Sequence, residues 1–191
     1  MTNIAIIVGS TREGSFNRAL GELAAASLEG QGANVTRVDL AAFDLPLYSA
    51  ALEANAFPPD ALKLKALFAA QDGLLFVSPE YNGSLSPLLK NAIDWASRPT
   101  GEESLVALSA YRGKAAAIMS ASISPFGGLR GLMHLRQILW TIQMLVIPEQ
   151  VVVPNAHAAF AEDGSLKEAL PASLVEMTAG RLVAVAKALA V

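Results

Sequence analysis

The stretch that decides the fold is Ile-Ala-Ile-Ile-Val-Gly-Ser-Thr-Arg-Glu-Gly-Ser-Phe-Asn, residues 4–17. Its apolar beginning predicts a strand that is buried on both faces, and a helical pattern starts near Phe16. The loop between them contains hydroxyl groups, a glycine and an arginine. Free backbone N–H groups at a helix start, together with hydroxyls and a guanidinium, are able to bind phosphate. This order of elements predicts a phosphorylated ligand behind the first strand.

Outward from this stretch, short apolar runs alternate with helical patterns. The predicted strands are residues 4–8, 34–39, 74–77, 115–119 and 150–153, and the predicted helices are residues 16–28, 61–70, 87–96, 129–142 and 170–189. Such alternation predicts an α/β fold of three layers, with a parallel sheet between two helical layers. Five strands with a site behind the first favour the order 2-1-3-4-5. Residues 44–59 and 99–110 are expected to be irregular, and residues 1–191 to form a single domain.

Composition excludes several classes of function. The net charge is −3, so no basic field indicates nucleic-acid binding, and the absence of cysteine excludes thiolate catalysis and cysteine-ligated metals. The N-terminus lacks the pattern of a signal peptide, and no apolar run is expected to reach the ~20 residues of a membrane span. We therefore expect a cytoplasmic protein. The two histidines, His134 and His157, form a poor metal set, and no metal site is predicted.

Three loops are expected at the carboxyl edge of the sheet, where ligands of such folds bind. The first loop (residues 9–17) matches neither the Walker motif nor the Gly-x-Gly-x-x-Gly fingerprint, and its hydroxyls and Arg12 suit a single terminal phosphate. The alternative is an ordinary helix cap by Ser15, with Arg12 in solvent.

The other two loops carry their own alternatives. The second loop (residues 78–84) reads Ser-Pro-Glu-Tyr-Asn-Gly-Ser, in which Tyr81 could pack on a ring and Asn82 could donate and accept hydrogen bonds. The alternative is a β-turn with a surface tyrosine. The third loop (residues 120–128) contains serines and paired glycines that permit close approach to a ligand, or it is a flexible connector. Chance does not readily place three such loops around one crevice.

At this point the motifs resemble a known family. Residues 9–17 read Gly-Ser-Thr-Arg-Glu-Gly-Ser-Phe-Asn. Residues 79–84 read Pro-Glu-Tyr-Asn-Gly-Ser and lead into Leu-Lys-Asn-Ala-Ile-Asp-Trp at residues 89–95. Residues 127–130 read Gly-Gly-Leu-Arg, and residues 134–137 read His-Leu-Arg-Gln. They resemble the NAD(P)H-dependent FMN reductase family of the flavodoxin-like fold, and most closely its bacterial chromate and quinone reductase branch, over residues 3–154.

The resemblance implies FMN as the cofactor and NADPH or NADH as the hydride donor. The phosphate would be gripped in the first loop, the isoalloxazine would meet the second, and the third would touch the flavin or its ribityl chain. The implied cofactor-binding residues are Ser10, Arg12, Ser15, Phe16, Asn17, Pro79, Glu80, Tyr81, Asn82, Gly83, Ser120 and Ser122. The segment Ser-Pro-Phe at residues 124–126 departs from the glycine that the family often has there.

The resemblance further implies a ping-pong reaction, with hydride transfer to FMN N5 followed by two-electron reduction of an acceptor. Quinone, chromate, azo compounds and free flavin are the candidate acceptors, and no side chain is nominated as acid, base or nucleophile. A homodimer or homotetramer is expected. The alternatives are a flavodoxin-type electron carrier or a flavin-binding regulatory protein that does not oxidise nicotinamide. Arg18 and Arg112 are candidates for a 2′-phosphate contact, and neither is assigned.

Overall fold

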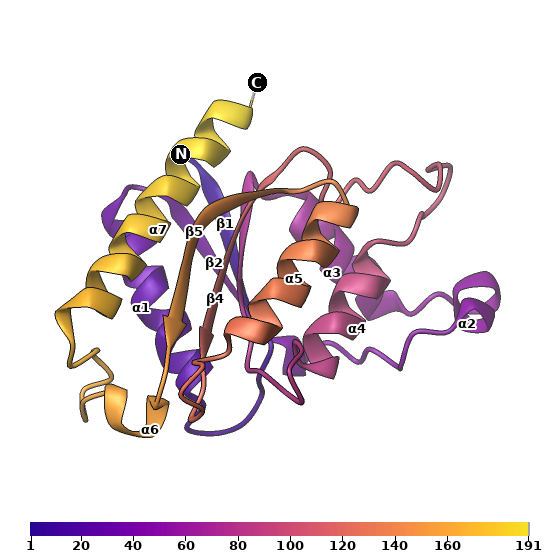
Figure 1. Ribbon diagram of the computed structural model, residues 1–191. Helices are drawn as coiled ribbons and strands as arrows, with labels where there is room; N and C mark the ends of the chain where they lie inside the picture. The colour runs from indigo at the N-terminus through magenta and orange to yellow at the C-terminus, as the bar shows by residue number, and fades with distance from the viewer. Residues whose placement is uncertain (191) are drawn as a thin grey trace.

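The computed structural model describes residues 1–190, and its centre is a five-stranded parallel sheet. The strands are β1 (Asn3–Val8), β2 (Asn34–Val38), β3 (Gly73–Val77), β4 (Ala115–Ala121) and β5 (Leu145–Val153). Their order is β2-β1-β3-β4-β5, and every neighbouring pair is parallel. The predicted order 2-1-3-4-5 is confirmed, and the carboxyl ends of the strands lie together at the bottom of Figure 1.

Helices cover both faces of this sheet (Figure 1). The helices α1 (Phe16–Gly30) and α7 (Ala169–Leu189) pack on one face, and α3 (Pro59–Ala69), α4 (Pro87–Ala96) and α5 (Leu129–Thr141) pack on the other. Each face has its own buried apolar cluster, so the sheet separates two cores. The three-layer α/β architecture is therefore confirmed.

The central strands are apolar along their whole length because helices bury them from both sides. Every residue of β3 and β4 is buried, which explains the near-continuous apolar runs in the sequence. The helix α4 begins as its sequence predicts, since Ser86 caps it by accepting from the N–H of Leu89 (3.2 Å) and Pro87 occupies the first turn.

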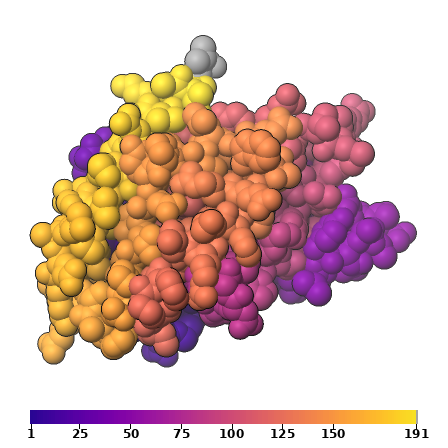
Figure 2. All heavy atoms as spheres, viewed as in Figure 1, coloured from indigo at the N-terminus to yellow at the C-terminus, as the bar shows by residue number. Residues whose placement is uncertain are grey.

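Two predictions of local structure needed correction. The strand β5 begins at Leu145, five residues before the predicted start, because it is an edge strand whose first half buries only Ile147 and whose pairing with β4 is irregular. The segment at residues 44–59 contains a short helix, α2 (Ala50–Asn55), that buries none of its residues. It projects from the body of the molecule at the right of Figure 1 and Figure 2.

The excursion that carries α2 is fixed to the body by α4. The indole N–H of Trp95 donates to the carbonyl of Pro46 (2.6 Å), and the carboxamide of Asn91 accepts from the N–H of Tyr48 (2.8 Å). The rings of Tyr48 and Phe57 pack edge-on against the indole of Trp95. The remaining short elements are a 3-10 helix, η1 (Leu40–Ala42), and α6 (Ala156–Ala159).

Among residues 1–190, α7 is the one helix whose length and composition would suit a membrane span. The helix contains Glu176, Arg181 and Lys187, so it is not an uninterrupted apolar run of that length. In the structure α7 packs along β4, β5 and α1, and it buries Val175, Ala179, Leu182 and Ala186. This packing accounts for the buried stripe of the helix, whereas Leu170 and Met177 remain exposed.

Candidate functional site

A chain of buried serine side chains connects the carboxyl ends of β1, β3 and β4. The Ser86 hydroxyl donates to the carbonyl of Gly9 (2.6 Å), and the Ser78 hydroxyl accepts from the backbone N–H of Ser86 (3.2 Å). The Ser120 hydroxyl donates to the carbonyl of Ser78 (2.7 Å). A Cβ at Gly9 would lie 2.7 Å from Ser86 Oγ, which is why glycine is needed there. These bonds hold the three loops at one edge of the sheet.

The first loop contains a run of unpaired backbone donors. Ser15 caps α1, since its hydroxyl accepts from the N–H of Arg18 (3.4 Å). Within residues 1–190, the backbone N–H groups of residues 10–17 and the hydroxyl of Ser10 make no hydrogen bond. Gly14 turns the exposed tip of the loop with a φ of +63°. Free N–H groups and hydroxyls at a helix start are the features that bind phosphate.

Arg12 is exposed at the tip of this loop. Its guanidinium lies 5.7 Å from the centre of the Phe16 ring, and Nη2 makes one long hydrogen bond to the carbonyl of Gly14 (3.4 Å). The Phe16 ring is itself stacked on Phe160, with 5.9 Å between ring centres. The guanidinium therefore has donors to spare for an anion, whereas Phe16 has a packing role.

Asn17 was predicted to contact the phosphate, but its side chain does not face the open part of the first loop. Its carboxamide is buried, donates to the carbonyl of Ala121 (2.8 Å) and accepts from the N–H of Ala121 (2.9 Å). The side chain thus joins the start of α1 to the end of β4. A contact of Asn17 with a ligand would have to come mainly from its free backbone N–H.

The second loop ends in a tight turn. Tyr81 and Ser84 exchange two backbone hydrogen bonds, of 2.8 Å and 3.0 Å. Between them Asn82 and Gly83 both have positive φ, 51° and 78°, which is the type I′ geometry that Asn-Gly favours. The Tyr81 side chain is 52% exposed, and no described residue accepts from the N–H groups of Asn82 and Gly83. An aromatic face and free donors thus stand beside the first loop.

Glu80 lies at the start of this turn, after the half-buried Pro79, and its carboxylate points to α5. The side chain is 3% exposed and accepts from Arg130 Nε (2.9 Å) and from the backbone N–H of Gly131 (3.0 Å). Burial raises the pKa of this carboxyl, but the bonds from Arg130 and Gly131 outweigh burial and hold the pKa below 4.5. The carboxylate is occupied, so any ligand contact of Glu80 would come from its backbone.

The two serines predicted in the third loop have different environments, since Ser120 belongs to β4, which extends to Ala121, and only Ser122 lies in the loop. Ser120 is fully buried, and its hydroxyl is committed to Ser78. Ser122 is half-buried, and its hydroxyl accepts from the N–H of Ser124 (3.2 Å), which leaves its own proton free to donate. Ile123 and Phe126 are 67% and 57% exposed, so the departure from the family pattern adds apolar surface beside the site.

Ser86 was not singled out in the sequence, and Arg130 was noted only as part of the Gly-Gly-Leu-Arg motif, without its contact with Glu80. The pair Ser86-Pro87 is a helix-start signal, and it identifies Ser86 as a cap. It does not reveal the bond to Gly9, since 77 positions separate the two residues. Likewise, Arg130 meets Glu80 across 50 positions, which only the packing of α5 against the second loop brings together.

Two other features lie near this edge. His134 Nδ1 is 3.1 Å from the Ser84 hydroxyl, and His157 is exposed on α6. In the part of the chain that the structure describes, no three His, Asp or Glu side chains gather where they could hold a metal ion.

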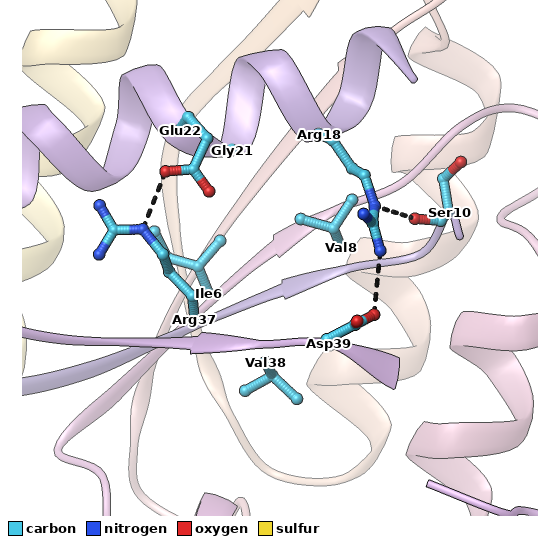
Figure 3. A pocket seen from close by; sticks show the side chains of 9 residues that line it. All are labelled: Ile6, Val8, Ser10, Arg18, Gly21, Glu22, Arg37, Val38 and Asp39. Carbon is cyan, nitrogen blue, oxygen red and sulfur yellow. Dashed lines mark hydrogen bonds and ion pairs between the residues drawn. The ribbon is translucent and has the colours of Figure 1, made fainter. Parts of the chain in front are cut away.

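A hollow of about 300 Å³ lies on the other side of the first loop, between α1 and the β1–β2 edge (Figure 3). Ion pairs cross it from Arg18 to Asp39 (3.0 Å) and from Arg37 to Glu22 (2.9 Å). Arg18 Nε also donates to the carbonyl of Ser10 (3.2 Å). Both guanidinium groups are therefore already neutralised, and Arg18 is not free for a 2′-phosphate. The three loops converge instead on the β3–β4 side of β1.

A doubly wound parallel sheet with a phosphate-binding type of loop behind β1 defines a flavodoxin-like, mononucleotide-binding class of protein. The family model for NADPH-dependent FMN reductases matches residues 2–158, and the chain belongs to that family. FMN and NAD(P)H are accordingly its cofactors, and the prediction of an oxidoreductase of this type is confirmed.

Similar proteins of this kind come from several organisms. An NAD(P)H-dependent FMN reductase of Pseudomonas aeruginosa is 36% identical and covers 89% of this chain and 87% of its own length. A 2-hydroxy-1,4-benzoquinone reductase of a Burkholderia species is 39% identical, with 78% and 77% covered. The solved structure of the flavoenzyme NAD(P)H:(acceptor) oxidoreductase FerB of Paracoccus denitrificans is 29% identical, with a TM-score of 0.83 and 98% of both chains covered.

The residues at the carboxyl edge fit FMN. The free N–H groups of residues 10–17 and the exposed guanidinium of Arg12 suit the phosphate. The free N–H groups of Asn82 and Gly83 suit the carbonyl and nitrogen edge of the flavin ring, and the Tyr81 ring supplies an aromatic surface. These donors stand on neighbouring loops, as a ligand with a phosphate at one end and a polar ring at the other requires.

Proposed function

We propose that the protein reduces quinones with NAD(P)H in a ping-pong reaction that uses one open site. This proposal is carried by two features at the same edge of the sheet. The first loop has free N–H groups that suit a phosphate, and Tyr81 and Phe126 expose aromatic surface beside it. A fixed mononucleotide with a reachable ring is what such an edge accommodates. The names of relatives support quinones as acceptors, since a 2-hydroxy-1,4-benzoquinone reductase and a Pseudomonas putida quinone reductase are among them.

When bound, FMN accepts hydride from NAD(P)H and delivers two electrons to the acceptor. The overall reaction converts NAD(P)H, a proton and a quinone to NAD(P)⁺ and a hydroquinone, so that atoms and electrons balance. The chain supplies binding, orientation and electrostatics. No side chain is assigned as acid, base or nucleophile, and protons for the hydroquinone are taken from solvent at the exposed face.

In this proposal the three loops divide the work. The first loop binds the phosphate through the N–H groups of residues 10–17, the hydroxyls of Ser10 and Ser15, and Arg12. The second loop would hold the ring through the free N–H groups of Asn82 and Gly83, fixed donors of the kind that stabilise negative charge. Tyr81 and Phe126 border the space that the donor and the acceptor occupy in turn.

The decisive experiment is anaerobic reduction of the FMN-loaded protein, followed by visible absorption. NADPH should bleach the flavin, and addition of 1,4-benzoquinone should restore the oxidised spectrum with one quinone consumed per flavin. Persistent absorption after NADPH would contradict the proposal and would favour an electron carrier or a regulatory flavoprotein. The same reoxidation measured with chromate, an azo dye and free FMN ranks the other acceptors.

Tyr81→Ala provides a residue-level test of the open face. Because the side chain is 52% exposed, its removal should leave the melting temperature within a few degrees while it raises the KM for quinones roughly tenfold. Trp140→Ala is the matched control, since Trp140 is also an exposed aromatic residue but belongs to the far end of α5. Identical quinone kinetics in Tyr81→Ala and wild type would remove Tyr81 from the site.

Three finer features are also proposed from the resemblance: a preference for NADPH, a homodimer or homotetramer, and a cytoplasmic location. Steady-state rates with NADPH and NADH measure the first, and sedimentation velocity of the FMN-loaded protein measures the second. A single species of one chain at micromolar concentration would contradict the proposed assembly. Fractionation of cells that express the chain measures the third.

A further inference from the structure

The side chain of Glu80 is the most deeply buried carboxylate at the candidate site, and FMN binding as proposed makes no use of it. It is 3% exposed and accepts hydrogen bonds from Arg130 and from the N–H of Gly131. A buried carboxylate requires such partners, because an unpaired charge in this position would be strongly destabilising. Glu80 therefore links the second loop to the first turn of α5.

Glycines make this close approach possible. A Cβ at Gly131 would lie 3.1 Å from the carbonyl oxygen of Ser84 and 3.4 Å from Glu80 Cγ. A Cβ at Gly128 would lie 1.9 Å from Ser120 Oγ, and Gly128 has a φ of +94° that only glycine adopts readily. The backbones of the second loop and of α5 thus meet at a distance that side chains would prevent.

Arg130 extends the link to the third loop. Its guanidinium donates to Glu80 on one side and lies 5.0 Å from the centre of the Phe126 ring on the other. A cation over an aromatic face is attractive, and the planar guanidinium is able to stack and donate at the same time. Glu80, Arg130 and Phe126 consequently form a continuous bridge between the second and third loops.

We infer that Glu80 and Arg130 are a positioning pair, which sets the spacing of the two loops that flank the flavin ring. This inference rests on the proposed function for its consequence, since correct spacing aligns the ring with the donor and acceptor. In this inference the side chain of Glu80 holds the second loop in position through Arg130 and does not itself contact the cofactor. The first loop is tied to β4 by Asn17 and lies outside this bridge.

The test uses FMN and riboflavin, which differ in the phosphate alone. Glu80→Gln keeps the shape of the side chain but removes the charge, and Arg130→Met keeps an unbranched apolar stem but removes the guanidinium and its bonds. Each variant should weaken binding of FMN and of riboflavin by the same factor, roughly tenfold, and reduce the rate of flavin reduction per bound flavin roughly tenfold to a hundredfold. The ratio of the two affinities should stay at the wild-type value, because the phosphate grip is intact.

The two changes should also fail to add. If the residues act as one unit, the double variant should be no worse than the weaker-binding single variant, whereas independent residues would give multiplied losses. Arg181→Ala, which breaks the ion pair with Glu149 between α7 and β5, is the matched control and should leave both affinities unchanged. A second measurement follows hydrogen exchange of residues 79–84 and 126–131 without flavin, where both variants should accelerate exchange in both loops.

Several results would overturn the inference. One is that both single variants bind riboflavin and exchange hydrogen as the wild type does. Another is that affinity falls for FMN but not for riboflavin. The third is that the losses of affinity multiply in the double variant. Glu80→Gln leaves no buried charge unpaired, and Arg130 is 55% exposed on its side chain, so Glu80→Gln is expected to fold even if Arg130→Met, which removes the cation beside the buried Glu80 carboxylate, does not. Failure of the proposed function would look different, since NAD(P)H would then not reduce the flavin of the wild-type protein. Hydrogen exchange of the two loops would still decide whether Glu80 and Arg130 set their spacing.

Discussion

In the first loop the backbone N–H groups of residues 10–17 are unpaired and Arg12 is exposed. In the second loop and at the end of β4, by contrast, the side chains of Glu80 and Ser120 are buried and hydrogen-bonded to neighbouring elements. A phosphate needs many donors of approximate geometry, whereas an open ring between a donor and an acceptor needs walls at a fixed spacing. The difference implies that the N–H groups and the Arg12 side chain of the first loop are available to a ligand, whereas the buried side chains of the other two loops hold the backbone in place, including the free N–H groups of Asn82 and Gly83.

The strongest test of the fixed loops is Gly128→Ala. The new Cβ would overlap Ser120 Oγ at 1.9 Å and would require a φ of +94°, so the third loop must move. We expect a loss of about 3 kcal/mol or more in the free energy of unfolding, together with loss of flavin binding. Gly164→Ala is the matched control, because Gly164 has a φ of +84° with nothing within 4 Å, and about 1–2 kcal/mol is expected there.

Chemical denaturation of both variants measures the comparison. Equal losses in Gly128→Ala and Gly164→Ala would show that backbone conformation alone matters and that the contact with Ser120 does not fix the third loop.

The next effect in size concerns the boundary between the two regions. Asn17→Ala removes both side-chain bonds to the backbone of Ala121. Because the N–H and carbonyl of Ala121 then lose these partners inside the protein, the free energy of unfolding should fall by about 2–4 kcal/mol. Flavin binding should weaken as well, since the first loop would no longer be tied to β4. Asn34→Ala, which removes an exposed bond to Asn3, should change stability by no more than about 0.5 kcal/mol. Thermal unfolding measures this, and a wild-type stability of Asn17→Ala would contradict the proposed role of the Asn17 amide in joining α1 to β4.

Arg12→Ala tests the free donors. The guanidinium is exposed and makes one long intramolecular bond, so the melting temperature should not change, whereas FMN affinity should fall roughly tenfold to a hundredfold. Riboflavin affinity should stay at the wild-type value, and the rate per bound flavin should be unaltered. Arg112→Ala serves as the surface control. Unchanged FMN occupancy in Arg12→Ala would remove Arg12 from the phosphate site.

The smallest expected effect is a dependence on pH in the fixed loops. The pKa of Glu80 lies below its usual 4.5 in the folded protein, so its ionised form contributes stability that is complete above that value and is lost as the pH falls through the folded pKa. The difference in unfolding free energy between wild type and Glu80→Gln should therefore shrink as the pH is lowered from 7 toward 3. Denaturation at several pH values measures this, and a difference that stays constant would contradict the bond with Arg130 as its source.

Much of the fold was predictable from local patterns. The apolar runs of the central strands, the helix-start signal at Ser86-Pro87 and the alternation of strand and helix carry their information within a few residues. The edge strand β5 was harder to predict, because its first half is mostly unburied and contains Pro148. That the three loops lie at one edge was predictable for a related reason, since all parallel strands end at the same edge.

By itself, the sequence determined the strand order, the layers, the three loops and the class of ligand, because strand periodicity, glycine turns and hydroxyl-rich helix starts are properties of neighbouring residues. The tertiary structure alone decided which of those polar side chains stay free. Asn17, Glu80 and Ser120 have partners 104, 51 and 42 positions away, and only the packing of α1, α5 and β4 brings these groups within hydrogen-bond distance. Because a buried polar group must be paired, those distant contacts determine which residues remain available to a ligand.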